Sequence, residues 1–207
     1  MSKPPEHSVV DPPPDDGSPD TAIRSASSAP GLLHALRSGR LLVAIVATAD
    51  EVDASGAEKS SHMSVVSMVS ADGRRGLLAF TGLDSLQAWD RDARPVPVSG
   101  AAAAEAALDD GCEAIVVDVA GPKRQVVVEA DLLDLAGKDP LEHARSLAEG
   151  ILDDGSGVQR ATVEVVEDRL RIRSREIGQP EIVAALQAST RVLALVPGGI
   201  EVQAPQS

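Results

Sequence analysis

The sequence predicts an α/β protein of the α+β kind, in which helices flank a mixed β-sheet. The run 40–48 is apolar from Leu41 to Ala47 and has the length of a strand that is covered on both faces, and the run 114–119 is expected to be a second buried strand. Segments with apolar residues at helical spacing lie between and after these runs. We expect a disordered tail over residues 1–29, an α/β domain over 30–137, and a smaller C-terminal α/β lobe or an extension of the sheet over 138–207.

The tail prediction follows from composition. The first 29 residues are rich in Pro, Asp and Ser and have no sustained apolar period, which is typical of disorder. Leu32, Leu33 and Leu36 then form one apolar stripe, and Gly39 is a helix stop signal. A short helix is therefore expected to lead into the strand over 40–48.

The next stretch is expected to be a loop followed by a hairpin. Residues 49–61 are polar and break the apolar pattern. Residues 62–80 contain two apolar runs separated by Asp72-Gly73, a turn signal between strands.

A strand and a short helix are predicted around the two aromatic side chains of the chain, Phe80 and Trp89. The residues up to Phe80 form an apolar run of strand length, while Leu83, Leu86 and Trp89 recur at helical spacing. Beyond them, each proline of the Arg94-to-Val98 segment fixes its own φ and disfavours the α region for the residue before it. That segment should therefore run extended.

A helix, two strands and another short helix complete the predicted domain. Ser99 is expected to cap the helix, with Ala102, Ala106 and Leu108 facing inward. The strand over 114–119 follows, then an edge strand over 125–129 and a short helix over 131–137. Lys138-Asp139-Pro140 marks the boundary of the domain.

The C-terminal part is expected to have the order αββαββ. It begins with a helix over 141–152, which is followed by a hairpin over 161–174. The alternating apolar residues of this hairpin indicate that one of its faces is exposed to solvent. A helix from Pro180 and two short strands, over 191–197 and 199–203, close the chain.

Charge and cysteine content narrow the classes of function. A net charge of −13 and a pI of about 4.6 argue against a general nucleic-acid binder, which needs a basic surface to neutralise phosphates. The single Cys cannot form an internal disulfide, and no apolar N-terminal segment follows a basic start. We therefore expect a cytoplasmic protein, with no membrane and no nucleic acid among its partners.

The order of these pieces resembles the N-terminal domain of the SseB family, in its actinobacterial, high-GC type. The resemblance covers roughly residues 30–136 and is carried by four segments, GRLLVAIVAT (39–48), GAEKSSHMSVVSMVSADGRRGLLAFTGLDSLQAWD (56–90), ARPVPVSG (93–100) and AALDDGCEAIVVDVAG (106–121). It implies a small cytosolic α/β domain named after a serine-sensitivity phenotype, and it carries over no catalytic residue and no cofactor.

No set of residues predicts catalysis or metal binding. Ser60, Ser61 and His62 lack the glycines of a nucleophile elbow, and the acids beside Cys112 would raise its pKa rather than activate it. The four His residues and the paired Asp residues do not have metal-ligand spacing. The basic turns at 72–75 and 121–124 are interpreted as hairpin tips, since neither is a phosphate-binding loop. We expect no cofactor and no metal.

Two functions remain. The favoured one is a non-catalytic binding or regulatory protein with a protein partner, in which Trp89 and Arg94 are presented by the stiff segment with Pro95 and Pro97. In the alternative for this surface, Trp89 is a core anchor and Asp90 pairs with Arg91 or Arg94. The second function is a small-molecule-handling enzyme whose site joins Lys59, Ser60 and Ser61 to the segment 89–94. An enzyme needs polar groups that converge in a cleft, whereas a binding protein needs a flatter apolar patch.

Overall fold

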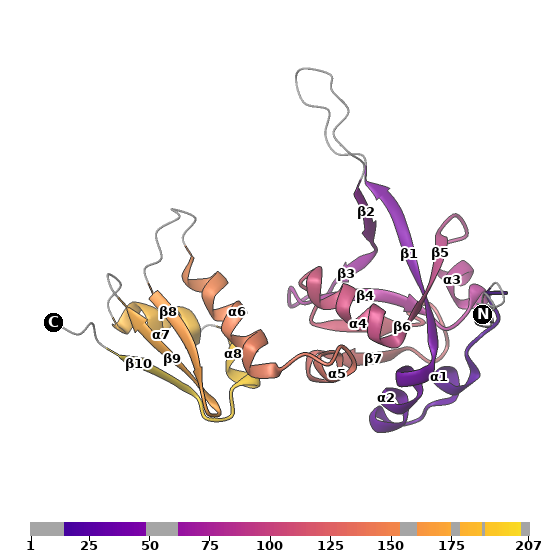
Figure 1. The fold of residues 1–207 in the computed structure, drawn as a ribbon. Coiled ribbons are helices and arrows are strands. Elements are labelled where there is room, and N and C mark those ends of the chain that lie inside the picture. Colours follow the sequence, from indigo (N-terminus) through magenta and orange to yellow (C-terminus); the bar gives the residue numbers. More distant parts are fainter. Residues whose placement is uncertain (1–14, 49–61, 154–160, 175–178, 188, 204–207) are drawn as a thin grey trace, which may run out of the picture.

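The structure is a computed structural model that describes residues 15–48, 62–153, 161–174, 179–187 and 189–203 (Figure 1). Its elements in chain order are α1 (Thr21–Ser25), α2 (Ala29–Ser38), β1 (Arg40–Thr48), β2 (His62–Val65), β3 (Ser67–Val69), β4 (Arg75–Phe80), α3 (Leu83–Trp89), β5 (Arg94–Ser99), α4 (Gly100–Asp109), β6 (Ala114–Val117), β7 (Gln125–Val128), α5 (Glu129–Leu135), α6 (Pro140–Leu152), β8 (Ala161–Val166), β9 (Arg169–Ser174), α7 (Gln179–Gln187), α8 (Thr190–Leu195) and β10 (Ile200–Gln203).

The first sheet has seven strands among the described residues and is mixed, as predicted. Its main order is β2-β1-β4-β6-β7, while β3 pairs with β4 and β5 pairs with β1. Strands β4 and β6 are parallel, and the other pairs are antiparallel. The parallel pair is joined through α3, β5 and α4, which gives the crossover that a parallel connection requires.

Strand β1 is covered on both faces, as its apolar run predicted. Leu41 and Val43 belong to a large core cluster on one face of the sheet, and Leu42 and Ala44 belong to a smaller cluster on the other. Helices α2, α4 and α5 supply buried side chains to the large cluster, and α3 supplies Leu86 to the smaller one. The alternation of a strand therefore distributes one continuous apolar run between two cores.

The C-terminal strands form a sheet of their own, so they do not extend the first sheet. Its order is β10-β9-β8, with β10 parallel to β9 and β8 antiparallel to it. In Figure 1 this sheet and helices α6, α7 and α8 lie beside the first sheet, and the chain passes between the two parts after α5. The buried side chains Val163, Leu170 and Ile172 form part of the large core cluster.

The prediction that residues 1–29 form a disordered tail is wrong for residues 15–29, while residues 1–14 lie outside the described residues. Asp20 caps α1 by accepting from the backbone N–H groups of Ala22 and Ile23 at 3.0 and 3.1 Å. The side chain of Ile23 is fully buried in the large core cluster. One apolar residue in a polar segment gives no periodicity, which is why the pattern missed this helix.

The prediction of a strand over 191–197 is also wrong, because residues 190–195 form α8. Ser189 caps this helix by accepting from the backbone N–H of Val192. Val192, Leu195 and Val196 are buried at the i, i+3, i+4 spacing of a helix face. The C-terminal order is therefore αββααβ, and packing has overridden the strand propensity of Val and Leu.

The inward face of α4 is rotated relative to the prediction. Ala103, Ala104, Ala107 and Leu108 are buried, whereas Ala102 is exposed. An Ala-rich segment has little contrast between its faces, so the sequence identifies the helix better than its orientation.

Candidate functional site

Trp89, the last residue of α3, is half-buried against the smaller core cluster. Its ring centroid lies 5.5 Å from that of Phe80, with the ring planes at 31°. Such a tilted aromatic contact is favourable beyond the area that it buries. Trp89 thus holds the end of α3 on the sheet and keeps part of its ring exposed.

The Arg-Pro-Val-Pro segment forms β5 and runs extended, as predicted. Its Pro95 and Pro97 are opposite Ala44 and Leu42 of β1 and are exposed. Val96 packs instead against the large core cluster, as expected from the alternation of a strand. Both prolines therefore lie on the same face of the sheet as the smaller core cluster and Trp89.

A row of apolar residues crosses the sheet at this point. Phe80 is opposite Leu42, and Leu42 is in turn opposite Pro97. Trp89 packs on Phe80 at the covered end of the row, and the exposed end is Pro97. We call the surface formed by Trp89, Pro95 and Pro97 the β5 shelf.

The other residues of the predicted site do not join this shelf. Arg94 is exposed. It is two residues before Val96 in the strand, so its side chain is on the same face of the sheet as Val96, which is the face opposite to Trp89. Asp90 accepts from the backbone N–H of Asp92 at 2.9 Å, and no ion pair joins it to Arg91 or Arg94 within the described part of the chain. Lys59, Ser60 and Ser61 lie outside the described residues.

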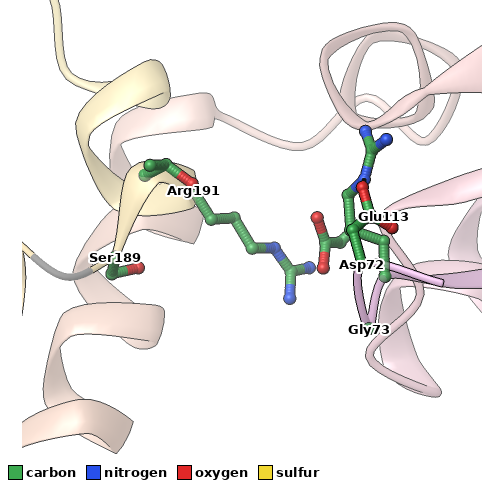
Figure 2. Close-up of a pocket in the computed structure, with 7 residues that line it drawn as sticks. Asp72, Gly73, Glu113, Ser189 and Arg191 are labelled. Carbon is green, nitrogen blue, oxygen red and sulfur yellow. Dashed lines mark hydrogen bonds and ion pairs between the residues drawn. The ribbon is translucent and has the colours of Figure 1, made fainter. Parts of the chain in front are cut away.

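A cleft of about 650 Å³ lies between the two sheets (Figure 2). One wall carries the β3–β4 turn with Asp72, Gly73 and Arg74, together with Glu113 just before β6. The other wall is the start of α8, with Ser189, Thr190 and Arg191. Figure 2 shows the Arg191 side chain reaching from α8 toward the wall of Asp72 and Glu113.

The charges of this cleft are only partly paired. Arg74 Nε donates to Asp72 Oδ2 at 2.8 Å, and the Ser70 hydroxyl and Arg74 together lower the pKa of Asp72. The carboxylate of Glu113 has no hydrogen-bond or ion-pair partner among the described residues. One wall thus presents a free carboxylate toward a guanidinium on the other.

Glu129, the first residue of α5, connects the two parts of the chain. Its Oε1 accepts from Arg191 Nε at 2.7 Å and lies 2.9 Å from His143 Nε2. Its side chain is only 13% exposed, and burial raises its pKa, but the hydrogen bonds from His143 and Arg191 outweigh burial and hold the pKa below the ordinary value. Arg191 Nη2 is buried and lies 2.6 Å from the same oxygen, so the guanidinium is ion-paired with Glu129.

A second polar cluster lies at the carboxyl ends of the parallel strands β4 and β6. Asp118 is 5% exposed and has a φ of 52°, and its carboxylate accepts from the backbone N–H and hydroxyl of Thr81 at 2.9 and 2.7 Å. Arg24 of α1 donates to Thr81 Oγ1 at 2.9 Å and to both oxygens of Asp84 at 2.8 and 2.7 Å. These contacts attach α1 to the sheet, and every polar group named here has a partner.

Cys112 is a structural residue. Its side chain is fully buried, and burial together with the nearby Asp110 carboxylate raises its pKa to about 11. At neutral pH the thiol is therefore protonated and a poor nucleophile. Among the described residues, no group of three or more His, Cys, Asp or Glu side chains is arranged to hold a metal ion.

The sequence did not reveal the cleft, because its residues come from a turn, a loop and the start of a helix that are far apart in the chain. The Asp-Gly turn at 72–73 is visible in the sequence, but the sequence indicates only a hairpin tip there. The sequence predicts a strand at Arg191, whereas the structure places this residue at the start of a helix. Only the packing of α8 against α6 places Arg191 beside Glu129.

Comparison with known proteins gives one match. A family model described as SseB protein N-terminal domain matches residues 21–133. The match includes α1, which the sequence pattern had left in the tail. No curated protein and no solved structure matches the chain. None of the helices described here is long and apolar enough to cross a membrane.

Proposed function

Because this chain belongs to the SseB family through its N-terminal domain, we propose that it is a non-catalytic binding protein whose partner is another protein. The family match identifies the N-terminal domain but names no activity, so the protein-binding activity is our proposal. We place the binding surface at the β5 shelf.

The observation that carries this proposal is the exposure of Pro95 and Pro97 on the sheet face that Trp89 only partly covers. Aromatic residues are enriched among the side chains that dominate binding energy at protein interfaces. The prolines and the packed indole are already held in place, so little conformational entropy is lost when a partner binds. A partly buried Trp beside two rigid apolar rings therefore provides a preorganised apolar surface.

The edge of β5 favours side-chain contact over the addition of a strand. A proline has no N–H, so it is accepted in a sheet only where that group would point away from the neighbouring strand. The N–H positions of Pro95 and Pro97 therefore face away from β1, which leaves the outer edge without donors at two of its six residues. We expect the partner to place an apolar side chain on the shelf rather than to extend the sheet.

The test is capture of partners from the native cell by the immobilised full-length chain and by shelf variants. Pro97→Ser and Pro95→Ser remove exposed rings and leave Trp89 and the core unchanged. Pro122→Ser is the matched control, because Pro122 is an exposed proline in the β6–β7 turn, outside the shelf. We expect both shelf variants to lose a partner that wild type and the Pro122 variant retain. Equal capture by all four proteins would contradict the proposed surface.

A further inference from the structure

The first described residue of the chain, Asp15, is held beside the β5 shelf. Its Oδ2 lies 2.6 Å from Arg40 Nε, and its Oδ1 accepts from Arg40 Nη2 at 2.7 Å. Arg40 is the first residue of β1 and alternates with Leu42 and Ala44, so its side chain is on the sheet face of the smaller core cluster. Pro97 is opposite Leu42, so Asp15 is held on the same face as the shelf.

Gly17 fixes the same segment from its other side. Its carbonyl accepts from the backbone N–H of Leu83, the first residue of α3, at 2.9 Å. Gly17 is buried with a φ of 73°, and an added Cβ would lie 2.2 Å from Leu83 Cδ1, so this close contact requires glycine. Residues 15–17 are therefore held between β1 and α3, and the residues before them start from a fixed point on this face.

The distance from this point to the shelf is short. Pro97 is displaced from Arg40 by two positions along the strand, about 7 Å, and by one strand spacing, about 5 Å. The three residues before Asp15 are all prolines, and we call residues 12–14, which lie outside the described residues, the proline run. Three prolines in the extended form that proline favours span about 9 Å. The shelf therefore lies within reach of the proline run.

The chemistry of the shelf suits such an occupant. Proline-rich segments bind surfaces lined by aromatic side chains, because their extended form is already ordered before binding. The shelf offers the part of the Trp89 ring that is exposed and the exposed rings of Pro95 and Pro97. Prolines carry no N–H, so the proline run buries no unpaired donor when it packs on the shelf.

We propose that the proline run covers the β5 shelf and competes there with the protein partner. Its regulatory consequence rests on the proposed function, whereas the contact itself does not. A short tether gives the proline run an effective concentration on the order of millimolar at the shelf, so a weak contact is enough to cover it. A partner then binds with an apparent affinity that is reduced by the fraction of molecules whose shelf is open.

Acrylamide quenching of Trp89, the single Trp of the chain, tests the contact in the full-length protein. The variant replaces all three prolines of the run (Pro12→Ser, Pro13→Ser and Pro14→Ser) and removes none of the described contacts. We expect its quenching constant to rise about twofold, since a shelf that is covered most of the time becomes open. The control, Pro4→Ser with Pro5→Ser, changes prolines further from the anchor and should match wild type. Unchanged quenching in the triple variant would overturn the proposal.

The anchor is tested separately by Asp15→Asn, which removes the charge that pairs with Arg40. This variant should also raise the quenching constant of Trp89, because the proline run is then no longer held beside the shelf. Asp16→Asn is the matched control, since the neighbouring carboxylate accepts from the backbone N–H of Ser18 at 2.8 Å. Equal quenching in the two Asn variants would contradict the anchoring role of Asp15.

Capture of the partner distinguishes this inference from the proposed function. If the partner also binds the shelf, the triple proline variant should capture more of it than wild type does. A rise in quenching without a change in capture would support the covering contact and contradict the shelf as the site of the partner. Unchanged quenching would contradict the covering contact, whatever is captured.

Discussion

Glu129 is the residue at which the two parts of the chain are joined by charge. Its carboxylate receives Arg191 of α8 and faces His143 of α6, and only 13% of its side chain is exposed. Removing the carboxylate would leave the Arg191 guanidinium without its main partner in a largely dry position. This carboxylate therefore joins the shared apolar core in holding the two parts of the chain together.

The pH dependence of stability should report this role. The pKa of Glu129 is lower in the folded protein than its ordinary 4.5, so ionised Glu129 stabilises the fold above that value, and the contribution is lost as the pH falls through the folded pKa. We expect Glu129→Gln to lower the free energy of unfolding by about 1 to 3 kcal/mol at pH 7.

Denaturant unfolding of both proteins at pH 7 and at pH 3 measures this effect. Other carboxylates that accept hydrogen bonds also protonate in acid, but they are common to both proteins and cancel in the difference. The difference should shrink at pH 3. A difference that stays constant across this range would show that the Glu129 charge does not contribute.

Among the elements, α1 shows most clearly what the sequence pattern cannot reveal. The long helices and the apolar strands were predictable because their burial repeats with a fixed period. Helix α1 has five residues, and a single side chain, Ile23, is buried in the core. Its other contacts, such as Arg24 with Asp84, join residues that are far apart in the chain, so no local pattern indicates them.

Helix α1 should consequently contribute to stability, contrary to the expectation that residues 1–29 form a disordered tail. Ile23→Ala creates a cavity in a fully buried position, and we expect a loss of about 2 to 5 kcal/mol in the free energy of unfolding. Ala22→Gly is a useful comparison, because Ala22 is exposed in the same helix and should cost about 1 kcal/mol or less. Equal effects of the two substitutions would show that α1 is not docked on the core.

For the whole molecule, composition and periodicity predicted the fold class, a mixed sheet and the positions of most strands along the chain. They left the placement of the C-terminal strands open, because strand pairing is a long-range property that local patterns do not encode. The same limit applies to function. Trp89 was identified from its rarity, but the cleft between the sheets depends on how α8 packs, and the sequence had predicted a strand there.

The central claim is that Trp89 contributes an exposed edge to a protein-binding shelf, and the single Trp makes this directly measurable. Fluorescence quenching by acrylamide should show intermediate accessibility of Trp89 in the free protein, since the indole is half-buried against Phe80. Saturation with the partner captured by wild type and lost by Pro97→Ser should reduce that quenching markedly. Quenching that stays unchanged at saturation would place the partner elsewhere and contradict the account.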